Sequence, residues 1–183
     1  MRVLTMGVVL VVYALAFGCR RHPVDSSGSP PLTNADIQIS DDNKLDERIR
    51  EKAFGISEGK GSRGLRMVYS TALVEDEVNN GGFNQYFWNT DGESAQDALS
   101  GFGLIGASKH AAIMKEAIDI WRTEKTQMER FKSSNSLQDF SDSYKHTKLN
   151  PLDDRFYKLE SEENLTALRA KYVRSRPQEF VGK

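Results

Sequence analysis

The spacing of apolar side chains constrains the fold of this chain more than any other feature. Apolar residues recur every three or four positions from Leu45 to Tyr172, and no stretch alternates cleanly with a period of two. A spacing of three to four places side chains on one face of an α-helix, whereas half-buried strands alternate. We therefore expect an all-α fold, a compact multi-helix domain.

The apolar stripes also predict where the helices lie. The expected stripes are Leu45, Ile49, Ala53 and Ile56; Met67, Thr71, Val74 and Val78; Ala95, Ala98, Leu99 and Phe102; Ile113, Ala117, Ile120, Trp121, Met128 and Phe131; Leu137, Phe140 and Tyr144; Phe156 and Leu159; and Leu165, Leu168 and Tyr172. Between them, Ser94 and Ser136 are candidate helix caps, Gly81 stands where a left-handed cap belongs, and Asn150-Pro151 predicts a turn.

The N-terminus predicts export and a lipid anchor. A basic start at Arg2 precedes a mainly apolar run from Val3 to Phe17, which has the length of a secretory signal rather than of a membrane span. The run ends in Leu15-Ala16-Phe17-Gly18-Cys19, which resembles a bacterial lipobox, and Cys19 is the only cysteine. We expect residues 1–18 to be a signal peptide and Cys19 to carry acyl chains such as palmitate. The alternatives are an ordinary signal peptide with a chance cysteine, or an uncleaved anchor.

A flexible tether is expected to follow the anchor. Residues 19–44 are rich in Pro, Ser, Gly and Asp and contain few large apolar side chains. Such a segment buries too little surface to offset the entropy of ordering it. The predicted protein is a membrane-anchored lipoprotein of the bacterial cell envelope, in which the tether joins the bilayer to a helical domain at residues 45–183.

Composition argues against several classes of site. The formal net charge is −1 and no basic stripe forms, so no nucleic-acid partner is expected. A zinc site needs three or four convergent ligands, yet the chain has three scattered histidines and one cysteine. The glycine patterns at 59–64 and 101–106 follow helices, not strands, and are expected to be turns rather than nucleotide sites. We expect no metal, no cofactor and no catalytic residue.

The stretch EDEVNNGGFNQYFWN, residues 75–89, carries the strongest hint of function. Glu75, Asp76 and Glu77 fall near the expected end of a helix, where the macrodipole disfavours acids by ~0.3–1 kcal/mol each. Acidic residues at a position where the helix dipole disfavours them are a modest indication of function. The candidate partner-binding residues are therefore Glu75, Asp76, Glu77, Tyr86 and Trp88, and the candidate structural motif is Gly81, Gly82, Phe83 and Gln85. In the alternative interpretation the aromatic residues form core and the acids accept backbone hydrogen bonds.

The same stretch carries a family resemblance. Residues 79–89, together with Glu75, Glu77 and the LIGA of residues 104–107, resemble the C-terminal domain family of a bacterial DNA-mimic protein. The segment 150–180, with its Asp-x-Phe/Tyr core and final Pro-x-x-Phe, is similar to the end of that family. The resemblance implies an all-α domain without known catalysis, in which the studied mimic presents carboxylates in place of DNA phosphates to a transcription factor.

Two features of this chain depart from DNA mimicry. A mimic must match about one phosphate charge per ~1.7 Å of duplex axis. Removal of the signal leaves 24 bases against 26 acids, a net charge of only −2. An exported lipoprotein also does not meet a transcription factor. We expect the fold to carry over and the mimicry not to.

Two functions from different classes fit these features. The first is a membrane-tethered, non-catalytic module that binds another protein through the acidic and aromatic stretch. The alternative is an envelope hydrolase that uses Glu75 or Glu77 as general base with a divalent metal. An enzyme needs these acids to converge in a pocket, whereas a module needs them on an exposed face.

Overall fold

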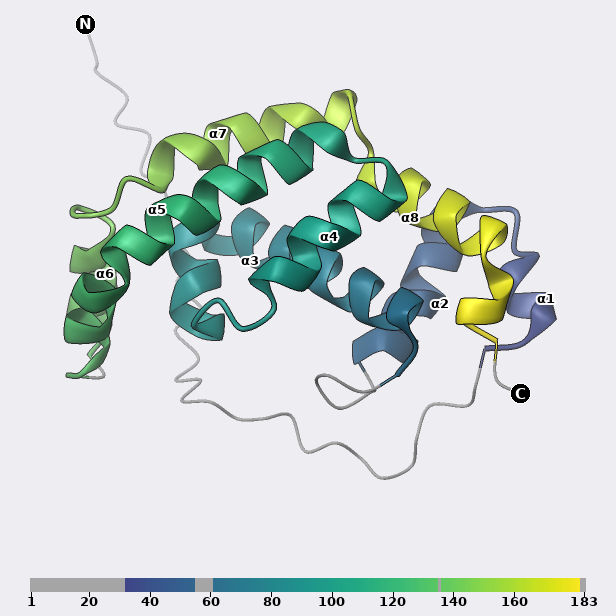
Figure 1. The fold of residues 1–183 in the computed structure, drawn as a ribbon, viewed down its shortest axis with the longest axis horizontal. Helices are drawn as coiled ribbons and strands as arrows, with labels where there is room; N and C mark the ends of the chain where they lie inside the picture. The colour runs from purple at the N-terminus through teal and green to yellow at the C-terminus, as the bar shows by residue number, and fades with distance from the viewer. Residues whose placement is uncertain (1–31, 55–60, 135, 182–183) are drawn as a thin grey trace, which may run out of the picture.

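The structure is a computed structural model that describes residues 32–54, 61–134 and 136–181. It is helical, as expected (Figure 1). In chain order the elements are α1 (Asn34–Ile37), α2 (Asp42–Phe54), α3 (Arg63–Thr90), α4 (Ala95–Ile105), α5 (Ser108–Lys132), α6 (Leu137–Ser143), α7 (Asn150–Lys158), the 3₁₀ turn η1 (Leu159–Ser161), α8 (Leu165–Ser175) and the 3₁₀ turn η2 (Pro177–Glu179). In these ranges the only β-type pairing is one parallel bridge between Leu32 and Val181.

The long helix α3 lies at the centre of the arrangement. It packs against α2, α4, α5 and α7, while α2 also packs against α8. Figure 1 shows α5 and α7 side by side along one edge, with α1, α2 and α8 gathered at the end that holds the C-terminus. No helix in the described ranges has both the length and the apolar character needed to cross a membrane.

The core follows from the apolar stripes. Val74 and Val78 of α3 and Ala117 of α5 are fully buried, as their spacing predicts. Aromatic side chains connect helices across the core. Phe87 of α3 stacks on Trp121 of α5 with ring centroids 5.0 Å apart, and Phe83 of α3 packs edge-to-face on Phe156 of α7. Such pairs add ~0.5–1.5 kcal/mol beyond their buried area.

The domain begins earlier than the sequence suggests. Residues 32–44, expected to be part of the tether, are packed onto the domain in the structure. Leu32 and Ile37 are 1% and 2% exposed, and Thr33 and Asp36 form a capping box at the start of α1. These two buried side chains attach the segment to the domain together with the ion pairs of Asp36 with Arg48 and of Asp42 with Arg174. The predicted signal peptide, Cys19 and the rest of the tether lie outside the described residues.

Helix α3 bends near its middle. Its backbone is not helical at Gly81 (φ −161°, ψ 25°) and Gly82 (φ 75°, ψ 179°), so a first half that ends at Asn80 meets a second half that starts at Phe83. The expected left-handed conformation at Gly81 is therefore wrong, because the residue with positive φ is Gly82. We call the bend, together with the side chains that hold it, the glycine joint.

The expected caps and turn have mixed outcomes. Ser136 caps α6, since its hydroxyl accepts from the Asp139 N–H at 3.0 Å. Ser94 precedes α4 but makes no side-chain cap; its hydroxyl instead lies 3.1 Å from the hydroxyl of Tyr86. Asn150-Pro151 opens α7 rather than forming a separate turn, because proline is well tolerated in the first turn of a helix.

Candidate functional site

The glycine joint leaves backbone groups of α3 without helical partners, and side chains from residues 144–157 satisfy them. Tyr157 donates its hydroxyl to the Val78 carbonyl, and Tyr144 donates to the Gly81 carbonyl, both at 2.8 Å. On the other side of the bend, Asp153 Oδ1 accepts from the Phe83 N–H at 2.9 Å. Three side chains therefore replace the hydrogen bonds that the bend removes.

The two glycines are needed for different reasons. At Gly82 a Cβ atom would collide with the Asp153 carboxylate, and the positive φ is itself unfavourable for other residues. At Gly81 the φ is ordinary extended backbone, and a Cβ would meet the flexible side chain of Gln85 and, at 3.0 Å, the Tyr144 hydroxyl. Gly82 thus creates the space into which Asp153 fits.

Burial of the joint shifts the pKa of its acidic groups. Desolvation raises the pKa of Asp153 to about 6, although the Phe83 N–H opposes this and the neighbouring Asp154 adds to it. Burial likewise raises the pKa of Tyr144 to about 12. Tyr144 is therefore neutral at pH 7, whereas Asp153 changes its charge near pH 6.

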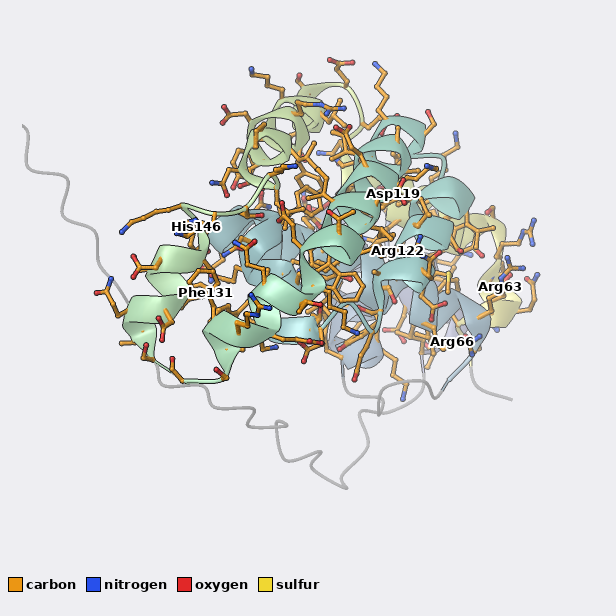
Figure 2. All side chains as sticks on the ribbon, turned by 60° about the vertical axis from the view of Figure 1, so that its left-hand side comes forward. Arg63, Arg66, Asp119, Arg122, Phe131 and His146 are labelled. Atoms are coloured by element: carbon orange, nitrogen blue, oxygen red, sulfur yellow. The ribbon has the colours of Figure 1, made fainter. Side chains whose placement is uncertain are left out.

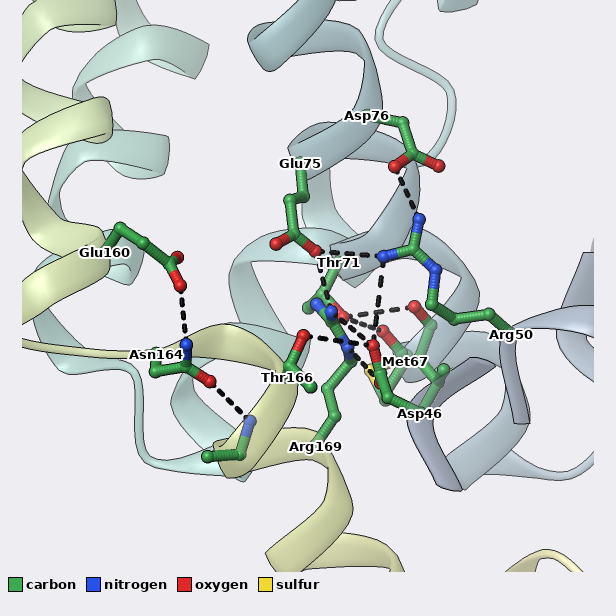
Figure 3. A network of polar contacts seen from close by, with 12 residues as sticks. Asp46, Arg50, Met67, Thr71, Glu75, Asp76, Glu160, Asn164, Thr166 and Arg169 are labelled. Atoms are coloured by element: carbon green, nitrogen blue, oxygen red, sulfur yellow. Dashed lines mark hydrogen bonds and ion pairs between the residues drawn. The ribbon is translucent and has the colours of Figure 1, made fainter. Parts of the chain in front are cut away.

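The first acid of the motif, Glu75, turns into the protein. It accepts from Arg169 Nη2 at 2.7 Å and from Arg50 Nη1 at 3.1 Å. Arg169 is fully buried and also binds Asp46 side-on, through Nε at 2.7 Å and Nη2 at 2.8 Å (Figure 3). Asp76 completes the group by pairing with Arg50. We call these five residues the Arg169 cluster.

Arg169 keeps its charge although it is buried. Burial alone would lower its pKa, but the hydrogen bonds that it donates to Asp46 and the charges of Glu75 and Asp46 raise the pKa above its ordinary value. A buried guanidinium is tolerated only when it is paired with good geometry. Glu75 is therefore a structural counter-ion.

Glu77 has different partners from the other two acids. The side chain of Asp76 is 51% exposed and lies at the rim of the Arg169 cluster. Glu77 turns toward the second half of α3, where its Oε2 accepts from Gln85 Nε2 at 2.8 Å and Asn89 Nδ2 at 2.7 Å. Successive residues of a helix are rotated by ~100°, so Glu77 lies away from the Arg169 cluster, in which Glu75 and Asp76 both pair with Arg50.

The two aromatic candidates also differ. Tyr86 is fully buried, so the structure places this predicted contact residue in the core, where it packs against Phe87. Trp88 is partly exposed and lies edge-to-face on Phe140 of α6, with ring centroids 4.9 Å apart. Of the predicted partner-binding residues, Asp76, Glu77 and Trp88 keep access to solvent, whereas Glu75 and Tyr86 serve the interior.

A comparison with protein-family models identifies the family of this chain. Residues 60–176 match the model described as DMP19-like protein. The chain belongs to the DMP19-like family. Comparisons with curated proteins and with solved structures found no match. The matched range contains the whole glycine joint as well as Glu75 and Arg169, while α1 and α2 precede it. This DMP19-like domain therefore completes its buried ion cluster with Asp46 and Arg50 from outside the matched range.

In the ranges that the structure describes, no group of three or more His, Cys, Asp or Glu side chains is placed to hold a metal ion. His110, at the start of α5, is buried and pairs with Glu163 at 2.9 Å. His146 stacks on Phe131 near the other end of α5, and charges of both signs line that helix, as Asp119 and Arg122 illustrate (Figure 2).

Sequence reasoning missed Arg169, Asp46 and the residues that hold the joint. One signal was present: Leu165, Arg169 and Tyr172 follow a spacing of four and three, which places the arginine on the buried stripe of α8. A charged residue at an apolar position predicts a buried partner. For Asp153 no comparable signal exists, because its role depends on the space above Gly82.

Proposed function

We propose that this DMP19-like protein is a membrane-tethered, non-catalytic protein-interaction module. The tether would start at acylated Cys19, and the contact surface would be the exposed side of the glycine joint. We call this surface the joint face and define it by Glu77, Gln85, Trp88, Asn89 and Leu137.

The observation that carries the proposal is the charge of Glu77. Its hydrogen bonds from Gln85 and Asn89 come from neutral amides, which orient the carboxylate without cancelling its charge. Glu75 and Asp76, by contrast, are bound to guanidinium groups. A negative charge that is positioned yet uncompensated is suited to a basic group of a partner.

Apolar surface beside Glu77 supports the same reading. Trp88 is partly exposed, and Leu137, one helical turn before Phe140 on α6, is 66% exposed. Exposed aromatic and aliphatic groups beside a charge are typical of the anchors of protein interfaces. The partner that fits is a protein with a basic and apolar patch, rather than a nucleic acid, whose phosphates Glu77 would repel.

The geometry does not favour the alternative hydrolase. A general base must reach its proton and, with a divalent metal, share the ion with other ligands. Glu75 is held by two arginines, and Glu77 points to another side of α3. The two carboxylates do not converge.

Site-specific crosslinking in the full-length protein tests the proposal. A photo-crosslinking amino acid at Leu137, the most exposed apolar residue of the joint face, should capture a protein in intact cells. The matched control is the same amino acid at Lys171, which is exposed on α8. Capture at Leu137 but not at Lys171 is the expected result. Equal capture at both positions, or none at Leu137, would contradict the proposed face.

The anchor is tested separately. Cys19→Ser should release the protein from the membrane fraction into the soluble exported fraction, because it removes the thiol that carries the acyl chains. Mass spectrometry of the wild type should find a diacylglyceryl group on Cys19. Membrane retention of the Cys19→Ser variant, with no acyl mass on the wild type, would refute the lipid anchor. This result would not contradict the proposed role of the joint face.

A further inference from the structure

We propose that Asp153 is a proton-operated latch of the glycine joint: the joint is closed when this carboxyl group is neutral and loosens when it is charged. The inference does not depend on what the joint face binds. It rests on the position of Asp153 between α7 and the bend of α3.

The latch is built from a close fit. The Asp153 carboxyl group occupies the space that the missing side chain of Gly82 leaves, and it receives the Phe83 N–H at 2.9 Å. Behind this contact, Phe83 lies edge-to-face on Phe156, with ring centroids 5.6 Å apart. Movement of Asp153 out of the joint would therefore remove the hydrogen bond that ties α7 to the start of the second half of α3 and leave the Phe83–Phe156 contact to hold the two helices.

The surroundings of Asp153 favour its neutral form. Tyr144 and Tyr157 direct their hydroxyl groups to carbonyls of α3 and not to this carboxyl group. On α7 itself, Asp154 is a like charge that raises the pKa of Asp153 further. Within the described ranges, none of the ion pairs involves Asp153.

The other charged groups around α7 are engaged elsewhere. Glu77 of α3 receives two amides and, through its charge, acts on Tyr144. On α5, Glu116 pairs with Arg155 at 2.7 Å, and His110 packs on Phe156 while paired with Glu163. A variant of Asp153 itself is therefore needed to assign any pH effect.

The direction of the effect follows from proton linkage. The closed joint holds Asp153 with a pKa of about 6, whereas the ordinary value is 3.8. The closed form thus binds the proton more tightly, so closure is favoured below the ordinary pKa and weakens as pH rises through about 6. Between pH 5 and pH 7 the opening constant should rise by up to about tenfold, less where solvent screens the exposed part of the carboxyl group.

Hydrogen exchange in the full chain tests the latch. Protection factors of amides in residues 83–90 should fall severalfold from pH 5 to pH 7, after correction for the intrinsic pH dependence of exchange. Asp153→Asn keeps an acceptor for the Phe83 N–H but cannot ionise, so its protection should not change with pH. Asp154→Asn is the control: it removes only the smallest contribution to the raised pKa of Asp153, so most of the pH dependence should remain.

Three results would overturn the latch. They are a pH-independent wild type, an Asp153→Asn variant that keeps the wild-type pH dependence, and an Asp154→Asn variant that loses it. If Asp153→Asn does not fold, an NMR titration of the carboxyl carbon in the wild type decides the matter. A midpoint well above the ordinary value supports the latch, and a midpoint at or below 4 refutes it.

Discussion

The Arg169 cluster and the glycine joint both fasten α3 to the C-terminal helices, but they do so with opposite chemistry. The cluster neutralises full charges against one another inside the protein, and its arginine is completely buried. The joint uses hydroxyl groups and a carboxyl group whose pKa lies near 6 to satisfy backbone atoms. One attachment depends on charges being present, whereas the other is strongest when its acid is neutral.

The difference also explains why neighbouring acids have different roles. Glu75 lies on the side of α3 that faces α2 and α8, where Arg50 and Arg169 need counter-ions. Glu77 lies on the side that faces the second half of α3, where only amides meet it. A run of like charges in a sequence is therefore not evidence of one charged surface.

Among the changes that test this comparison, removal of the Arg169 guanidinium should have the largest effect on stability. Arg169→Met leaves Asp46 and Glu75 without their buried partner and should lower the free energy of unfolding by ~3–5 kcal/mol. Arg155→Met is the control, because Arg155 is half exposed in its pair with Glu116 and should cost ~0–1 kcal/mol. Urea denaturation measures both. Equal effects would mean that the cluster is no more important than a surface pair.

The next largest effect is expected at the glycine joint, where substitutions of the two glycines should cost different amounts of stability. Gly82→Ala combines a positive φ with a collision against Asp153, and we expect a loss on the order of 2 kcal/mol. Gly81→Ala should cost about 1 kcal/mol or less, because its φ is allowed and Gln85 can rotate away. Thermal and urea melts of the two variants give the order. A larger loss at Gly81 would show that the fit around Asp153 is not what the motif protects.

Adjacent acids provide a finer comparison. Glu75→Gln removes a charge from the buried arginine and should cost ~1–3 kcal/mol. Asp76→Asn acts on an exposed pair and should cost ~0–1 kcal/mol. This revises the simple helix-end argument, under which neutralising either acid leaves the melting temperature unchanged or raised. If both variants melt like the wild type, Glu75 is not a structural counter-ion.

Local pattern was sufficient to predict the fold and insufficient to predict the site. The apolar stripes around Val74, Val78 and Ala117 predict helices and their buried faces, because helical periodicity can be recognised from residues that are close together in the sequence. Leu32 and Ile37 escaped notice because single apolar residues in a polar segment carry no period. Their burial depends on contacts formed only in the folded chain.

The partners of the motif could not be predicted for a related reason. Arg169 lies 94 residues from Glu75, and Asp153 lies 70 residues from Phe83. Nothing in the stretch 75–89 indicates which acid receives an arginine, or which glycine takes the positive φ. Both outcomes depend on α7 and α8, which are distant from this stretch in the sequence and contact it only in the folded protein.

The smallest effect expected on stability belongs to Glu77, and it gives the most direct test of the account. Glu77→Gln keeps an oxygen that accepts from Gln85 and Asn89, so its melting temperature should stay close to that of the wild type. The measurement is the yield of crosslinking from position 137 in the full-length protein, at low and at high salt. The account predicts a lower yield for Glu77→Gln, with the larger loss at low salt, where the attraction of the wild type is least screened. A yield equal to that of the wild type at both salt concentrations would contradict the claim that Glu77 is the acid that faces a partner.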